Sequence, residues 1–184
     1  MITVQPLELP EVLELTPRKF GDNRGFFSET YNRRRFAEIG IATDFVQDNQ
    51  SFSAFRGTLR GMHYQLPPHA QEKLVRVVKG AILDVVVDIR RSSPKFGKWT
   101  SLVISAKNWK QVFVPKGFAH GFITLEPDTE VVYKVSDFYS PEHDRSIRYD
   151  DPAIGIDWVV DDGEFHLSQK DMNAPLLAAA EVFD

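Results

Sequence analysis

The chain has 184 residues, of which 42% are hydrophobic and 26% are charged. This length suits one domain spanning residues 1–184 with a full core. The net charge of -4 argues against nucleic acid as a partner, because binding phosphates requires a basic face. We expect no membrane association and no disulfides, since no apolar run spans a bilayer and cysteine is absent. The N-terminus lacks the features of a signal peptide, which predicts a cytoplasmic location.

The first forty residues predict little regular structure apart from one helix. Residues 2–14 alternate loosely between apolar and polar and contain two prolines, which is typical of an edge strand or an arm. Residues 20–27 predict a turn-rich loop. Residues 31–39 predict a helix that ends at Gly40, and its three consecutive arginines at 33–35 are expected to face solvent.

From residue 44 to residue 138 the hydrophobic period is two, and short breaks rich in glycine and proline separate the segments. Many short strands of this kind predict an all-β sandwich or barrel, and the lack of helical patterns between them disfavours a parallel sheet. A last helix is predicted at residues 174–182. The predicted strands are residues 44–55, 58–66, 73–78, 81–89, 100–105, 111–114, 117–125 and 130–138.

Several polar side chains interrupt these apolar strands. His63 lies within one strand, where a lone histidine is more often structural. Lys73 begins the next strand, where a lone lysine more often reaches solvent. Asp84 stands in a continuous apolar run, so its carboxylate must be paired, and a histidine is the natural partner. His120 and Tyr133 lie in later strands. Together these groups offer a base, a cation and acids within one barrel, which suits removal of a proton next to a carbonyl.

A metal centre is the main alternative for these histidines. Residues 115–120, Pro-x-Gly-x-x-His, match the second histidine motif of cupin barrels, and Gly57 followed by His63 matches the start of the first. The place of a second histidine in that motif holds Gln65, and Glu72 is displaced from the usual glutamate position. Two remaining ligands make a poor transition-metal site, so we expect a barrel without metal.

Six motifs occur in order between residues 15 and 175: Gly21-Asp22-Asn23-Arg24-Gly25-Phe26-Phe27-x-Glu29, Phe45-Val46-Gln47-Asp48-Asn49, Arg60-Gly61-Met62-His63-Tyr64-Gln65, Pro115-x-Gly117-x-Ala119-His120-Gly121-Phe122, Tyr133-Lys134 and Leu167-Ser168-x-Lys170-Asp171. As a set they resemble the dTDP-4-dehydrorhamnose 3,5-epimerase family. The resemblance implies a cupin jelly-roll barrel with a few short flanking helices. It also implies a cofactor-free homodimer that epimerises C3 and C5 of a dTDP-linked 4-keto-6-deoxyhexose in dTDP-L-rhamnose biosynthesis.

The resemblance also implies roles for individual residues. His63 would be the proton acceptor with Asp171 as its orienting partner, and Tyr133 would be the proton donor on the opposite face. Lys73 would stabilise the enolate, and His120 would line the sugar pocket. Arg24 and Glu29 would act from the neighbouring subunit, and Asp144 stands where many relatives carry glutamate. The nucleotide- and diphosphate-binding positions would be Arg24, Glu29, Gln47, Asn49, Arg60, Asp144 and Lys170.

The sequence leaves two questions open. Arg60 and His63 fall on opposite faces of an ideal strand, so they share a site only if Gly61 introduces a bulge or Arg60 lies at the strand mouth. The same catalytic residues would also suit an epimerase that inverts one centre only. A metal-dependent cupin and a non-catalytic sugar-binding cupin are alternatives from other functional classes.

Overall fold

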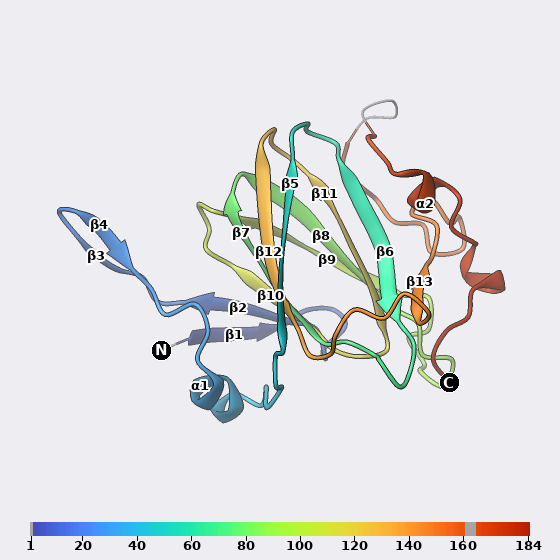
Figure 1. The fold of residues 1–184 in the computed structure, drawn as a ribbon, viewed down its shortest axis with the longest axis horizontal. Coiled ribbons are helices and arrows are strands. Elements are labelled where there is room, and N and C mark those ends of the chain that lie inside the picture. The colour runs from blue at the N-terminus through green and yellow to red at the C-terminus, as the bar shows by residue number, and fades with distance from the viewer. Residues whose placement is uncertain (1, 161–164) are drawn as a thin grey trace.

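Two antiparallel sheets face each other (Figure 1). The computed structural model describes residues 2–160 and 165–184. This architecture confirms the predicted all-β jelly-roll barrel of the cupin type. The six-stranded sheet has the order β1 (Ile2–Pro6), β2 (Leu13–Pro17), β10 (Gln111–Val114), β7 (Lys73–Lys79), β12 (Thr129–Val135) and β5 (Gln47–Ser53). The five-stranded sheet has the order β13 (Asp144–Ser146), β6 (Leu59–Gln65), β11 (Phe118–Thr124), β8 (Ala81–Asp88) and β9 (Trp99–Ser105).

Strand β8 is apolar at nearly every position because both of its faces are covered by the rest of the protein. All eight of its residues are buried. Ile82 and Val86 face inward and pack against the six-stranded sheet, whereas Leu83 and Val85 pack on the other side beneath the C-terminal segment. A strand covered on both faces loses the usual alternation. The eight strands predicted from the sequence are all present, with ends that differ by up to three residues, and the short strand β13 was not predicted.

The N-terminal region contains two hairpins. The predicted arm is the β1–β2 pair at the edge of the larger sheet. The prediction of a loop at residues 20–27 was wrong, because β3 (Phe20–Asp22) and β4 (Gly25–Phe27) pair as a hairpin. All six of these strand residues are exposed, and the hairpin projects away from the barrel (Figure 1).

Helix α1 (Arg33–Glu38) ends as its sequence predicted. Asn32 caps its N-terminus by accepting two backbone N–H groups, and the three arginines that begin the helix are exposed. Gly40 has a φ of +89°, which lets the Ile41 N–H reach back to the Phe36 carbonyl at 2.8 Å. Phe36 and Ile41 then pack together, so the cap fixes the path of the chain into β5.

The predicted helix at residues 174–182 was wrong. Only the short 3-10 helix η1 (Leu177–Ala179) forms there. The Leu177 N–H donates to the buried carboxylate of Asp151 at 2.6 Å, and both backbone groups of Phe183 bond to the loop after β8. Because the barrel takes these backbone groups, they are unavailable to an α-helix. A one-turn helix, α2 (Gln169–Met172), precedes this segment, and no helix in the described part of the chain could cross a membrane.

Candidate active site

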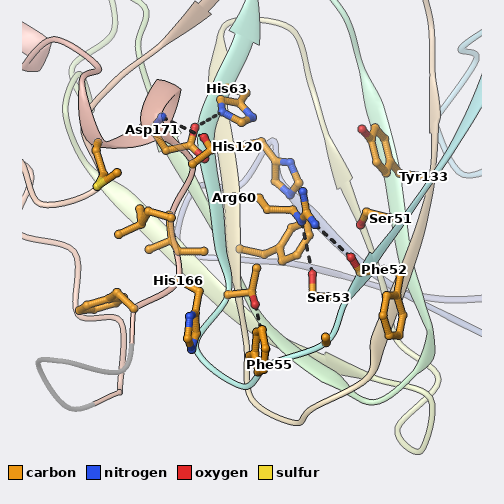
Figure 2. Close-up of a pocket in the computed structure, with 18 of the residues that line it drawn as sticks. Ser51, Phe52, Ser53, Phe55, Arg60, His63, His120, Tyr133, His166 and Asp171 are labelled. Atoms are coloured by element: carbon orange, nitrogen blue, oxygen red, sulfur yellow. Dashed lines mark hydrogen bonds and ion pairs between the residues drawn. The ribbon is translucent and has the colours of Figure 1, made fainter.

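A cavity of about 880 Å³ lies between the two sheets. Both sheets contribute polar side chains to it, and helix α2 closes one side (Figure 2). Five of the predicted catalytic and sugar-contacting residues line this cavity together with Arg60. The six residues are Arg60 and His63 from β6, Lys73 from β7, His120 from β11, Tyr133 from β12 and Asp171 from α2.

A bulge in β6 places Arg60 and His63 on the same cavity wall. These residues are three positions apart, yet their partners on β11, Phe122 and His120, are only two apart. The extra residue in β6 turns both side chains toward the cavity. Of the two arrangements that the sequence left open, the structure therefore has the bulge. Arg60 extends across to β5, where it donates to the Phe52 carbonyl at 3.0 Å.

His63 is held by a buried carboxylate. Its Nε2 lies 2.6 Å from Oδ1 of Asp171, which is 3% exposed. Burial alone would raise the pKa of Asp171, but hydrogen bonds and charge from His63, with a further bond from Ser168, hold that pKa below its ordinary value. The ionised Asp171 accepts a hydrogen bond from Nε2–H, so Nδ1 is the ring nitrogen of His63 that is left to take up a proton. This arrangement suits a general base.

Lys73 brings a cation into the same cavity. Its side chain is buried, and its Nζ donates to the His63 carbonyl at 3.2 Å. Burial lowers the pKa of Lys73 to about 8, while the carboxylates of Asp144 and Asp84 oppose this change. The ammonium can therefore meet a developing negative charge on a bound ligand in surroundings with little water.

Tyr133 lies across the cavity from His63 (Figure 2). It comes from β12, where Asn49 of β5 is its cross-strand partner. Burial raises the pKa of Tyr133, while its hydrogen bond with Asn49 partly offsets this. The phenol therefore stays protonated near neutral pH, and it can donate a proton on the side opposite His63.

A second histidine–carboxylate pair lies deeper in the barrel. His120 Nε2 is 2.8 Å from Oδ2 of Asp84, and both side chains are buried. The predicted pairing of Asp84 with a histidine is therefore confirmed, and its partner is His120. The pair supports the cavity wall next to His63, because His120 is the cross-strand partner of His63.

A second hollow of about 480 Å³ adjoins the cavity and shares His63, Lys73 and Tyr133 with it. Lys170 forms an ion pair with Asp144, whose carboxylate also accepts from the Tyr139 hydroxyl at 3.3 Å. Sequence reasoning missed Tyr139, although an aromatic pair directly before Ser-Pro was a signal of an exposed ring. Four residues predicted to bind nucleotide line this hollow: Gln47, Asn49, Asp144 and Lys170.

Arg24 and Glu29 do not reach this site within the chain. Arg24 lies at the exposed tip of the β3–β4 hairpin, where it pairs with Asp22 at 2.6 Å. Glu29 pairs with Arg35 of helix α1 at 2.9 Å. Neither side chain lines the cavity or the adjoining hollow. Their predicted role therefore requires a second copy of the chain and stays a prediction.

Gln65 occupies the position where a cupin metal site has its second histidine. Its amide nitrogen donates to the carbonyls of His69 and Phe138 at 2.7 and 3.2 Å, and its oxygen accepts from the Ser140 N–H at 2.8 Å. Gln65 thus fastens two loops to the end of β6. Glu72 accepts from the Thr43 hydroxyl at 2.6 Å. Residues 2–160 and 165–184 contain no group of three or more metal-ligating side chains placed to hold an ion.

Comparison with known proteins finds nucleotide-sugar epimerases both by sequence and by structure. A family model described as dTDP-4-dehydrorhamnose 3,5-epimerase matches residues 6–179. The dTDP-4-dehydrorhamnose 3,5-epimerase of Sinorhizobium fredii is 50% identical over 178 residues, which cover 97% of this chain and 91% of that protein.

Solved structures agree with the sequence comparison. A dTDP-6-deoxy-D-glucose-3,5-epimerase from Legionella pneumophila, in complex with dTDP-4-keto-L-rhamnose, matches with a TM-score of 0.93 and 43% identity over 97% of this chain and 94% of that one. A 3'-monoepimerase from Streptomyces bikiniensis, in complex with dTDP-quinovose, matches with a TM-score of 0.87 and 37% identity over 95% and 87% of the two chains.

Proposed function

Because this chain belongs to the dTDP-4-dehydrorhamnose 3,5-epimerase family, we propose that it inverts C3 and C5 of dTDP-4-dehydro-6-deoxy-D-glucose. The product is dTDP-4-dehydro-L-rhamnose, the precursor in dTDP-L-rhamnose biosynthesis. One observation carries the proposal: an oriented base, His63, and a protonated phenol, Tyr133, face one cavity from opposite sides. Inversion of a carbon needs this pair, since the proton must return on the face opposite to its removal.

One set of side chains serves both carbons. The protons at C3 and C5 are each next to the C4 ketone, so removal of either gives an enolate with its charge on the same oxygen. His63 removes the proton and the ammonium of Lys73 stabilises the enolate oxygen. Tyr133 then supplies a proton from the other side. The reaction moves only protons, so it needs no redox or group-transfer cofactor.

The adjoining hollow suits the nucleotide and its diphosphate. The position of the hollow supports this assignment, because His63, Lys73 and Tyr133 line both the hollow and the cavity. Arginine and lysine match phosphate oxygens through their donors, and the arginine fork does so bidentately. The amides of Gln47 and Asn49 offer neutral donors and acceptors for a base. We assign the nucleotide to Gln47, Asn49, Asp144 and Lys170 of this hollow, together with Arg60 of the adjoining cavity.

We propose that a homodimer completes this site. Arg24 and Glu29 would come from the second copy, whose β3–β4 hairpin is exposed and projects from its own barrel. The guanidinium of Arg24 is paired only with Asp22 from the same turn among the described residues, so it is available to a phosphate. The cytoplasmic location and the single domain spanning residues 1–184 remain predictions.

Incorporation of solvent deuterium tests the proposed reaction. Incubating the protein with dTDP-4-dehydro-6-deoxy-D-glucose in D₂O is expected to place deuterium at both C3 and C5, as read by NMR. Label at one carbon only would favour the alternative function, a single-centre epimerase. The similar Streptomyces protein is described as such an enzyme, a 3'-monoepimerase. Binding without label would point to a non-catalytic protein, and label that disappears after chelation would point to a metal-dependent cupin.

The buried cation gives the reaction an expected pH dependence. Lys73 is charged below its pKa of about 8 and neutral above it. We therefore expect kcat/KM to fall about tenfold for each pH unit above 8, because this parameter reports the free enzyme. The fall in kcat should begin at a higher pH, because kcat reports the enzyme with substrate bound and the negative diphosphate favours the charged form of Lys73. A Lys73→Met variant that kept this alkaline limb would show that another group titrates.

A further inference from the structure

Strand β5 presents a row of short polar side chains to the cavity. Alternate residues along it, from Gln47 to Ser53, face inward, while those between them are exposed. Asn49 accepts from Gln47 at 2.8 Å and Ser53 accepts from Arg60 at 3.3 Å. Ser51 lies between them, and its hydroxyl oxygen is buried without a hydrogen-bond partner among the described residues. Leaving a buried hydroxyl without a hydrogen bond is unfavourable. The neighbours of Ser51 in this row, Asn49 and Ser53, each have a side-chain partner.

Ser51 lies next to the proposed proton donor. It is directly opposite Val131 on β12, and Asn49 is opposite Tyr133, so Ser51 and Tyr133 are diagonal neighbours on one face of the sheet. Figure 2 shows Ser51 on the cavity wall between Tyr133 and Ser53. The same cavity contains His63, which comes from the facing sheet, and Lys73, which comes from β7 of the same sheet as Ser51. A ligand placed between the base and the phenol therefore passes close to Ser51.

We propose that the Ser51 hydroxyl binds a hydroxyl group of the hexose ring and thereby holds the ring between His63 and Tyr133. The inference rests on the proposed function. A serine hydroxyl both donates and accepts, which matches a neutral sugar hydroxyl, whereas the phosphates have cationic partners in Arg60 and Lys170. The hydroxyl can take three staggered positions about the Cα–Cβ bond, so a single rotation directs it to a bound sugar.

The test compares Ser51→Ala with Ser101→Ala. Ser101 is a serine of β9 that lies in a different groove, away from the cavity, so it controls for the same substitution in a strand. Affinities for dTDP-glucose and for dTDP are measured by calorimetry, together with kcat/KM and the unfolding temperature. For Ser51→Ala we expect affinity for dTDP-glucose and kcat/KM to fall about tenfold, as for loss of one hydrogen bond. Affinity for dTDP should be unchanged, and the unfolding temperature unchanged or higher.

Three results would overturn the inference. Unchanged affinity for dTDP-glucose would show that Ser51 makes no contact with the sugar, and an equal loss of dTDP affinity would move the contact to the nucleotide. A clear fall in the unfolding temperature would show a structural hydroxyl. Ser51→Cys gives a second test if the alanine variant does not fold, because a thiol fills the space but is a weak donor. The binding arm needs no turnover, so its result is independent of whether the wild-type protein epimerises the keto sugar.

Discussion

His63→Ala is expected to lower kcat about 10³-fold or more, with affinity for dTDP retained. The imidazole of His63 is the proposed base, and a buried carboxylate holds it at the cavity wall. Among the described histidines that line the cavity, only His63 and the buried His120 have a carboxylate partner. Alanine removes the base without filling the cavity. Turnover is measured by NMR with the keto sugar, deuterium exchange is measured in D₂O, and binding of dTDP is measured by calorimetry.

Two further variants sharpen this test. Asp171→Asn keeps the size of the side chain but removes the charge that holds the Nε2 proton, so it should lower kcat less than His63→Ala does. His69→Ala is the matched control, because His69 pairs with Asp137 in a loop and does not line the cavity. Near-normal turnover in His63→Ala would mean that a different group removes the proton.

Gly61→Ala is expected to destabilise the fold by about 3 kcal/mol or more, through overpacking and a strained backbone together. A Cβ at this position would lie 2.5 Å from Cα of Gly121 and 3.1 Å from the His120 carbonyl oxygen. Both contacts are with the backbone of β11, which cannot yield as a flexible side chain does. The residue also has a φ of +142°, which side chains rarely adopt.

Gly25→Ala separates these two causes. Gly25 has nearly the same φ, +138°, but a Cβ there would meet nothing within 4 Å. It should therefore lose only the backbone contribution, of the order of 1 kcal/mol. Denaturant unfolding of both variants gives the difference as the contribution of the close approach between β6 and β11. Equal losses would mean that β11 moves aside easily, and the bulge that aligns Arg60 with His63 would then be less tightly fixed than the packing implies.

The barrel could be predicted from the sequence because local patterns and tertiary packing agree there. Alternation of polar and apolar residues follows when one face of a strand is buried and the other meets solvent, as in β12. Residues 174–182 are rich in alanine and leucine, and such composition favours a helix when considered alone. Their backbone groups instead bond to the Asp151 carboxylate and to the loop after β8. No local pattern predicts hydrogen bonds to residues so far away.

The candidate site was predictable in part for a similar reason. His63 and Asp84 are polar residues in apolar strands, so each signals a buried contact even without a structure. The partner of His63 is 108 residues further along the chain, and only the family resemblance pointed to Asp171. Ser51 gave no signal, because a serine in an alternating strand is ordinary. Its interest arises from a missing partner, which only coordinates can show.

The hydrogen bonds of Gln65 have a consequence for protein engineering. Exchanging this residue for histidine would restore one ligand of the cupin metal pattern beside His63 and His120. It would also release the His69 and Phe138 carbonyls and the Ser140 N–H, which the amide now satisfies together. Imidazole has too few donors and acceptors to replace all three bonds. A designer seeking a metalloenzyme on this scaffold must therefore rebuild both loop anchors before adding ligands.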